Sequence, residues 1–414
     1  MSEVHTLKNS LRVFVDPMPS LETVALGVWS HAGSVNEQEA EHGIAHLLEH
    51  MAFKGTTTRS ARDIAEEIEG VGGYLNAATS HQRTGYYVRL LKDDIVLGLD
   101  ILSDILLCPT IANEELEKEK EVVVQEIGEA ADTPDDVVFE MLQAASWNKH
   151  PLARPILGTP DSVRAQTPSS LREFMSRWYH PENMVVAVAG NVDIEDFVRR
   201  AGDAFGDMKA REAAEPISAA EFAGGVSHDV RDIEQTHLAI ALPGVSVRDE
   251  DFFATRVFAD VLGGGMSSRL FQKIREERGL AYSVYAFADG YEECGLTGAY
   301  VGADHGQIVT AAGLIRDEIE AMASDVGRTE VDRARAMLRS SLMMSLENPS
   351  SRIEAGAGQL FVHDRVIPIA ELSSRLDAVS ADDVKRCAAR ALSGGLSISV
   401  VGAGDAEAVA AIFD

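Results

Sequence analysis

The second half of this 414-residue chain repeats the pattern of its first half, and this repetition limits the fold more than any other feature. A predicted strand at residues 236–242 corresponds to one at residues 23–29, and an apolar strand at residues 396–401 corresponds to one at residues 184–190. In each half, helical periodicity alternates with further strands. Because both halves are about 200 residues long, we expect an α+β fold of two homologous α/β-sandwich domains, each with helices on a mixed, largely antiparallel sheet.

The two predicted copies are joined by a segment that lacks either periodicity. Residues 209–227 are rich in Ala and Glu and contain one Pro and a pair of glycines. The predicted organisation is therefore an N-terminal domain at residues 1–208, this linker, and a homologous C-terminal domain at residues 228–414.

One motif carries residues of known chemistry at the spacing that the chemistry needs. His46 and His50 are four residues apart on a predicted helix and therefore project from one face, with Glu49 beside them. Two such imidazoles can bind one Zn²⁺ ion, and a neighbouring carboxylate can accept a proton from water at the metal. The pattern H-x-x-E-H is the inverted form of the zinc-protease motif H-E-x-x-H. The alternative is a buried structural helix, since several apolar residues follow the same period: Leu47, Leu48, Met51 and Phe53.

The metal-binding pattern is confined to the first copy. In the corresponding helix at residues 252–262, Arg256, Ala259 and Asp260 take the places of the three motif residues. This asymmetry is typical of a duplicated enzyme in which one copy has taken a supporting role.

A catalytic zinc site needs a third protein ligand besides two histidines and a water. The predicted helix at residues 114–131 offers several candidates: Glu115, Glu117, Glu119, Glu121, Glu126 and Glu129. Glu119 and Glu126 are seven residues apart and share one helix face. Most glutamates on such a helix are solvated surface groups, so spacing alone leaves the choice open.

The whole chain resembles the pitrilysin family of zinc peptidases, the inverzincins of peptidase family M16. The resemblance rests on the H-x-x-E-H motif followed by the sequence VVQEI at residues 123–127. It implies that Glu126 is the third ligand of a Zn²⁺ cofactor and that Glu119 is a further glutamate of the catalytic site. The length is similar to that of the mitochondrial processing peptidase branch, and of its beta subunit in particular.

Residues 267–284, SSRLFQKIREERGLAYSV, are similar to a second signature of this family. The resemblance implies that Arg275 and Tyr282 contact the substrate backbone and the developing oxyanion. Two structural alternatives are a surface ion pair of Arg275 with Glu277 or its neighbours and a core position for Tyr282.

Two further segments bear on substrate binding. Residues 133–140 resemble a segment of the processing-peptidase subunit that supplies two carboxylates for a substrate arginine, which implies this role for Asp136 and Glu140. The alternative is an acidic first helix turn that suits the helix dipole. The strand around Asn76, Ala77 and Ala78 resembles the family's edge strand, which implies that substrate binds there in extended form by β-addition.

Composition limits the partners. The formal net charge of −29 argues against nucleic acid and anionic membranes and favours basic peptides. The three cysteines include no C-x-x-C pair, and the N-terminal residues lack the features of a targeting peptide. We therefore expect a cytoplasmic protein.

Together these observations predict a zinc-dependent endopeptidase that cleaves extended, unfolded peptides and prefers Arg-containing, presequence-like segments. The alternatives are general oligopeptide degradation, basic-peptide binding with structural zinc, and a non-catalytic member of the same fold. Larger relatives close a chamber with four such domains, so the resemblance implies a homodimer. A monomer or a heterodimer stays open, and Arg275 and Tyr282 could act in cis or in trans.

Overall fold

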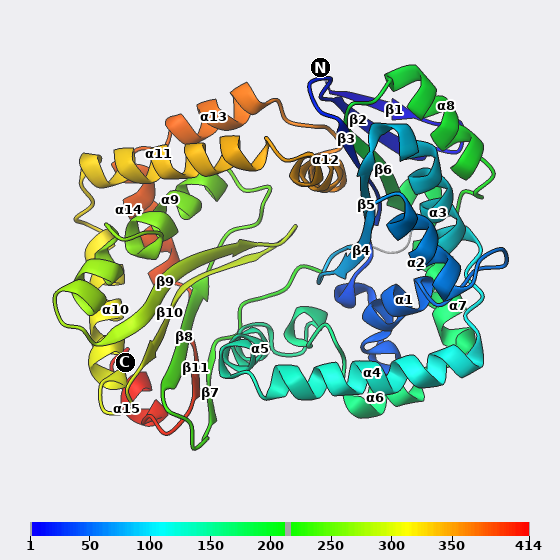
Figure 1. Cartoon of the computed structure of the whole chain (residues 1–414). Helices are drawn as coiled ribbons and strands as arrows, with labels where there is room; N and C mark the ends of the chain where they lie inside the picture. Colours follow the sequence, from blue (N-terminus) through cyan, green and yellow to red (C-terminus); the bar gives the residue numbers. More distant parts are fainter. Residues whose placement is uncertain (1, 212–216, 414) are drawn as a thin grey trace. The chain divides into compact units, whose positions relative to one another are not determined.

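A computed structural model describes residues 2–211 and 217–413 (Figure 1). The chain divides into two compact units. Unit 1 comprises Met1–Gly128, Pro155–Ile217 and Met343–Val366, and unit 2 comprises Glu129–Arg154, Ser218–Leu342 and Ile367–Asp414. Each unit holds one mixed sheet with helices packed on it, which confirms the predicted fold class.

The sheet of unit 1 has the strand order β1-β2-β6-β3-β5-β4. Its strands are β1 (Glu3–Thr6), β2 (Arg12–Pro17), β3 (Thr23–Ser30), β4 (Tyr74–Thr79), β5 (Thr84–Leu91) and β6 (Met184–Gly190). Only β2 and β6 pair in parallel, and all other neighbours are antiparallel. Strand β4 lies at the edge of this sheet, as expected for the strand that contains Asn76, Ala77 and Ala78.

The sheet of unit 2 repeats this topology. Its strands are β7 (Gly225–Asp229), β8 (Thr236–Pro243), β9 (Ala281–Gly290), β10 (Gly295–Ala303) and β11 (Ser397–Val401). The order β7-β11-β8-β10-β9 matches β2-β6-β3-β5-β4, and the one parallel pair again lies at the same place, between β7 and β11. The internal duplication inferred from the sequence therefore holds for five strands of each sheet, and β1 has no counterpart among the described strands of unit 2.

Helices complete both units. Those of unit 1 are α1 (Ile44–Ala52), α2 (Ala61–Gly70), α3 (Ile95–Leu107), α4 (Asn113–Ala131), α6 (Pro160–Ala165), α7 (Pro168–Trp178), α8 (Ile194–Phe205) and α12 (Pro349–His363). Those of unit 2 are α5 (Pro134–Trp147), α9 (Phe252–Gly263), the π-helical η6 (Phe271–Glu276), α10 (Ile308–Met322), α11 (Arg328–Ser345), α13 (Ile369–Asp377), α14 (Ala381–Leu392) and α15 (Ala406–Ala410). Short 3-10 turns are η1 (Ser34–Asn36), η2 (Glu39–Glu41), η3 (Lys92–Asp94), η4 (Pro151–Ala153) and η5 (Pro181–Asn183).

Each half of the chain lends one helix to the sheet of the other half. In unit 1, α12 packs on β2, β6 and β3, on the face opposite α3 (Figure 1), and buries Ile353 and Leu360 against Phe14 and Trp29. In unit 2, α5 packs on the equivalent strands β7, β11 and β8. The domain boundaries predicted from the sequence, at residues 1–208 and 228–414, stay a prediction. Each of the two compact units includes segments from both of these ranges.

The linker predicted at residues 209–227 is described only in part. Strand β7 already begins at Gly225, inside that segment, and residues 212–216 lie outside the described residues.

The close packing of α12 on its sheet predicts opposite effects for two glycine substitutions. A Cβ atom on Gly356 would lie 2.4 Å from a ring carbon of the buried Phe14, whereas one on Gly128 in α4 would meet no atom within 4 Å. Gly356→Ala should lower the free energy of unfolding by about 1–3 kcal/mol, because overpacking outweighs the better helix propensity of alanine.

Gly128→Ala is the matched control and should raise the free energy of unfolding by about 0.5–1 kcal/mol. Urea unfolding monitored by circular dichroism measures both values. A shift in the same direction for the two variants would contradict this account of the α12 packing.

Candidate metal centre

Helix α1 is held by a buried carboxylate at its start. Glu37 accepts hydrogen bonds from the backbone N–H groups of Gly43, at 2.9 Å, and Ala45, at 3.0 Å. These bonds satisfy donors that the first helical turn leaves free, and a negative charge suits the positive end of the helix dipole. Leu48 and Met51 are buried in the core of unit 1 and fix the rotation of the helix. The face that carries His46, Glu49 and His50 is thereby directed away from this core.

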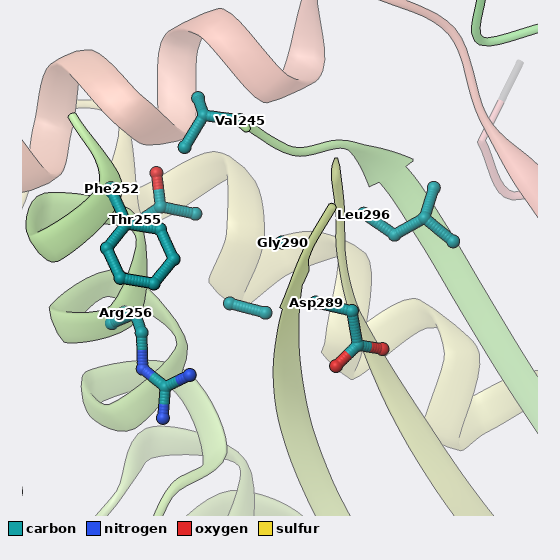
Figure 2. A pocket seen from close by; sticks show the side chains of 8 residues that line it. Val245, Phe252, Thr255, Arg256, Asp289, Gly290 and Leu296 are labelled. Carbon is teal, nitrogen blue, oxygen red and sulfur yellow. The ribbon is translucent and has the colours of Figure 1, made fainter. Parts of the chain in front are cut away.

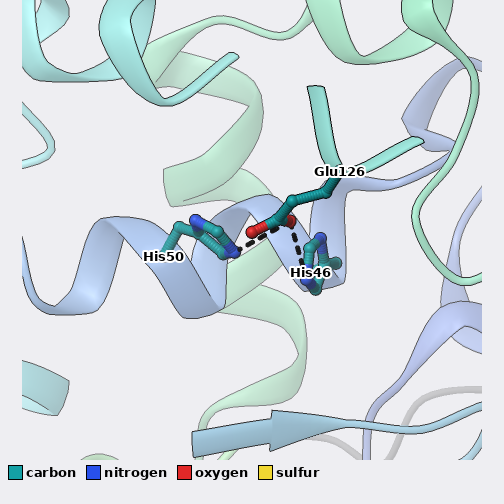
Figure 3. Close-up of side chains that lie close together, drawn as sticks. All are labelled: His46, His50 and Glu126. Carbon is teal, nitrogen blue, oxygen red and sulfur yellow. Dashed lines mark ion pairs between the residues drawn. The ribbon is translucent and has the colours of Figure 1, made fainter. Parts of the chain in front are cut away.

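Three side chains from two helices converge beside α1 (Figure 3). Glu126 of α4 places its Oε2 atom 3.8 Å from His46 Nε2 and 3.5 Å from His50 Nε2. One ligand atom from each of these three residues lies within 4.8 Å of the other two. Four ligands bound to zinc at about 2.0–2.2 Å lie about 3.4 Å apart in a tetrahedron, so the donor set and its spacing fit this ion.

The surroundings of the two histidines suit metal binding. Burial lowers the pKa of His46 to about 4, and the neighbouring His50 contributes, so His46 is neutral at neutral pH. The Nδ1 atom of His50 lies 3.2 Å from Oε2 of Glu119, whose other oxygen pairs with the ammonium of Lys54 at 2.7 Å. Because Glu119 contacts Nδ1, the other ring nitrogen of His50, Nε2, points toward Glu126. Lys54 thus helps to position Glu119. The sequence did not single out this role, although Lys54 lies only two residues after α1.

The side chain of Glu49, a residue of α1, reaches strand β4. The hydroxyl of Thr79 donates a hydrogen bond to Glu49 Oε2 at 2.5 Å. Burial raises the pKa of Glu49, and the hydrogen bond from Thr79 partly offsets this effect. Thr79 was also missed from sequence, although strand alternation places it on the same face as the buried Ala77, two residues earlier.

The structure places Arg275 and Tyr282 side by side in unit 2. Arg275, in η6, donates a hydrogen bond from Nη1 to the carbonyl oxygen of Tyr282 at 2.9 Å. Its guanidinium carbon lies 4.2 Å from the centre of the Tyr282 ring, which is a cation–π contact. Tyr282 is 77% exposed on β9, so the alternative of a core aromatic is wrong. The carboxylate nearest to Arg275 is that of Glu276, at 4.0 Å, a neighbour of Glu277.

Asp136 and Glu140 also belong to unit 2, on the exposed side of α5. Among the described residues, neither carboxylate pairs with a cation. Desolvation raises the pKa of Glu140, and the charge of Asp136 adds to this effect. The structure therefore gathers His46, His50, Glu126, Glu49 and Glu119 in unit 1 and leaves these two acids with Arg275 and Tyr282 in unit 2.

Helix α9, the counterpart of α1, carries no such cluster. Within residues 2–211 and 217–413, one group of three His, Cys, Asp or Glu side chains has its ligand atoms close enough together to hold a metal ion: His46, His50 and Glu126. In α9, Arg256 lines a small cleft together with Phe252 and Asp289 (Figure 2). This cleft has almost no room for a water molecule. Burial raises the pKa of Asp260, at the place of His50, to about 6. Among the described residues, such a ligand set is therefore found in unit 1.

Comparisons with known proteins agree with this architecture. The family model "Insulinase (Peptidase family M16)" matches residues 12–160, and "Peptidase M16 inactive domain" matches residues 166–338. An uncharacterized zinc protease of Rickettsia bellii is 37% identical over 400 residues, which cover 96% of this chain and 97% of the relative. An uncharacterized zinc protease of Bacillus subtilis is 35% identical and covers 93% of this chain and 94% of the relative.

Among solved structures, a protease from Helicobacter pylori superposes with a TM-score of 0.90 at 20% sequence identity, over 97% of this chain and 99% of that one. This likeness concerns the fold. The sequence relatives and the matched families show that the protein is a zinc protease, a metallopeptidase. The chain belongs to peptidase family M16, the insulinase or pitrilysin family. None of the helices that the structure describes is long and apolar enough to cross a membrane.

Proposed function

We propose that the chain is a zinc endopeptidase for extended, unfolded peptides, in which His46, His50 and Glu126 bind the metal and Glu49 moves the proton. The observation that carries this proposal is the convergence of the two Nε2 atoms and the Glu126 carboxylate beside Glu49. An intact ligand set with an adjacent, partly desolvated carboxylate favours catalysis over a structural zinc or a non-catalytic role.

The side chains divide the chemical work. When bound, zinc supplies Lewis-acid polarisation of the peptide carbonyl and lowers the pKa of a bound water. Glu49 accepts the proton of the attacking water and later delivers it to the leaving amine, while Thr79 orients the carboxylate. Glu119 fixes the ring of His50, so in this proposal it is a positioning residue. Tyr282 donates to the developing oxyanion, and Arg275 contacts the substrate backbone.

The free edge of β4 supports an extended substrate. This strand pairs with β5 on one side and has no strand partner on the other among the described residues. A peptide that adds to Asn76, Ala77 and Ala78 gains main-chain hydrogen bonds without needing a specific sequence. Because a folded substrate already uses these groups internally, we propose that the enzyme acts on unfolded segments.

Asp136 and Glu140 support a preference for arginine, as in the processing-peptidase branch. They lie one turn apart on α5 and lack a cationic partner among the described residues. A guanidinium can donate hydrogen bonds to both carboxylates. Desolvation raises the pKa of Glu140, and the nearby charge of Asp136 adds to this effect, so a bound guanidinium would relieve the repulsion between the two acids.

Removal of both charges tests this preference. Asp136→Asn combined with Glu140→Gln should lower kcat/KM for a quenched peptide containing one arginine by about 10–100-fold, since charge-assisted hydrogen bonds are lost. A matched peptide with norleucine at the same position should be cleaved at an unchanged rate. An equal loss on both peptides would show that the acids only support the fold.

We further propose a cytoplasmic homodimer. Free thiols at Cys108, Cys294 and Cys387 are consistent with a reducing compartment. In a twofold dimer, the zinc site of one subunit would use Arg275 and Tyr282 of the other.

Mixing two inactive variants, Glu49→Gln and Tyr282→Phe, tests this arrangement. At random subunit exchange it should restore about a quarter of the wild-type activity, because half of the dimers then contain one intact site of two. Absence of any recovery in exchanged mixtures would rule out pairing in trans.

A further inference from the structure

A cavity of about 460 Å³ with a mixed polar and apolar lining lies in unit 1, between the edge of the sheet and helix α12. Its walls include Tyr74 and Ala78 from β4, Tyr87 from β5, and Ser350 and Glu354 from the first turns of α12. Strand alternation places Tyr74 and Ala78 on the face opposite Ala77 and Thr79. The cavity therefore opens on the other face of the same edge strand whose Thr79 contacts Glu49.

The charge of this cavity is opposite to that of the chain. Its charged side chains are Arg83, Arg89 and Glu354, two cations and one anion, in a chain with a net charge of −29. Within the part of the chain that the structure describes, neither arginine forms an ion pair with a carboxylate. Two guanidiniums that form no ion pair among the described residues, against one carboxylate in the same partly enclosed space, favour an anionic ligand.

Neighbouring groups hold both guanidiniums in place. Arg89 stacks on the ring of Tyr74, with its guanidinium carbon 4.6 Å from the ring centre. Arg83 reaches helix α12, where its Nη1 atom lies against Gly358, so close that a Cβ atom there would be 2.1 Å away. The absence of a side chain at Gly358 thus leaves room for the Arg83 guanidinium at this place.

Strand β4 connects this cavity to the substrate. Side chains of a peptide added to β4 would alternate between the face of α1 and the face of α12. Ala78 contributes only a methyl group to the wall of the cavity on the side of β4. The rings of Tyr87 and Trp29 provide apolar walls for the methylene groups of a long acidic side chain.

We propose that this cavity is a specificity site for an acidic side chain, glutamate or aspartate, of a peptide bound along β4. The carboxylate accepts hydrogen bonds from Arg83 and Arg89, away from Glu354. This inference rests on the proposed peptidase function and adds a second requirement to it: substrates carry an acidic residue near the cleaved bond in addition to any arginine bound by Asp136 and Glu140.

The test measures binding rather than turnover. Zinc-loaded protein with Glu49→Gln is titrated into fluorescein-labelled peptides in which glutamate replaces glutamine at one position after another of a neutral sequence. Fluorescence anisotropy should show one position at which glutamate binds about tenfold more tightly than glutamine. Adding Arg83→Gln and Arg89→Gln should abolish this difference. Adding Arg62→Gln, a control on an exposed α2 side chain paired with Glu66, should preserve it.

Gly358→Ala gives an independent test, because it displaces the guanidinium of Arg83 while both charges stay. It should reduce the preference for glutamate, and it decides the question if the double arginine variant does not fold. The proposal is overturned if no position prefers glutamate, if the preference survives the arginine substitutions, or if Arg62→Gln removes it equally. Cleavage of quenched peptides by the wild-type protein reports separately on the proposed peptidase function.

Discussion

Glu49→Gln should abolish peptide hydrolysis while the protein keeps its zinc. The amide has the size of the carboxylate and can still contact Thr79, but it cannot accept a proton from water. Loss of general-base chemistry lowers rates by about 10²–10⁴-fold, and we expect a loss of this size in kcat. Turnover of a quenched peptide gives the rate, and elemental analysis gives the zinc content.

Thr79→Val serves as the matched comparison for Glu49→Gln. It removes the hydrogen bond to Glu49 but leaves the carboxylate in place. We therefore expect a smaller loss of kcat than for Glu49→Gln, with zinc again retained. Near-normal turnover by the Glu49→Gln protein would refute the proposed role of Glu49.

The second large effect concerns zinc affinity along helix α4. Glu126→Ala removes one of three proposed protein ligands and should lower zinc affinity by more than any other change on this helix. Glu119→Gln removes only the charged partner of His50 Nδ1 and of Lys54, and such changes typically lower metal affinity by about 10–100-fold. Competition with a chromophoric chelator measures both affinities.

The control for this series is Glu129→Gln, which changes an exposed glutamate on the same helix. It should leave zinc affinity unchanged. If Glu126→Ala bound zinc as tightly as this control, Glu126 would not be a ligand, and another carboxylate would have to take its place.

The local elements of the fold could be predicted because neighbouring residues determine them. The four-residue spacing of His46 and His50 requires a helix if both are to share a face, and α1 provides it. The helix predicted at residues 114–131 is α4, and the duplication predicted from two sets of strands is present in both sheets. By contrast, the choice of Glu126 among several glutamates came from a family resemblance, since helix spacing alone treats Glu119 and Glu126 alike.

What only the tertiary structure decided is how distant segments meet. Helices α5 and α12 each have an apolar face that suits a sheet, and nothing in their periodicity states that each packs on the sheet of the other half of the chain. The contacts of Thr79 with Glu49 and of Arg83 with α12 likewise join residues from separate elements. The sequence by itself determined the elements, the duplication and the motif, because these depend on local spacing. Packing between residues that are far apart in the chain determined the surroundings of the site, because such contacts leave no periodic signal in the sequence.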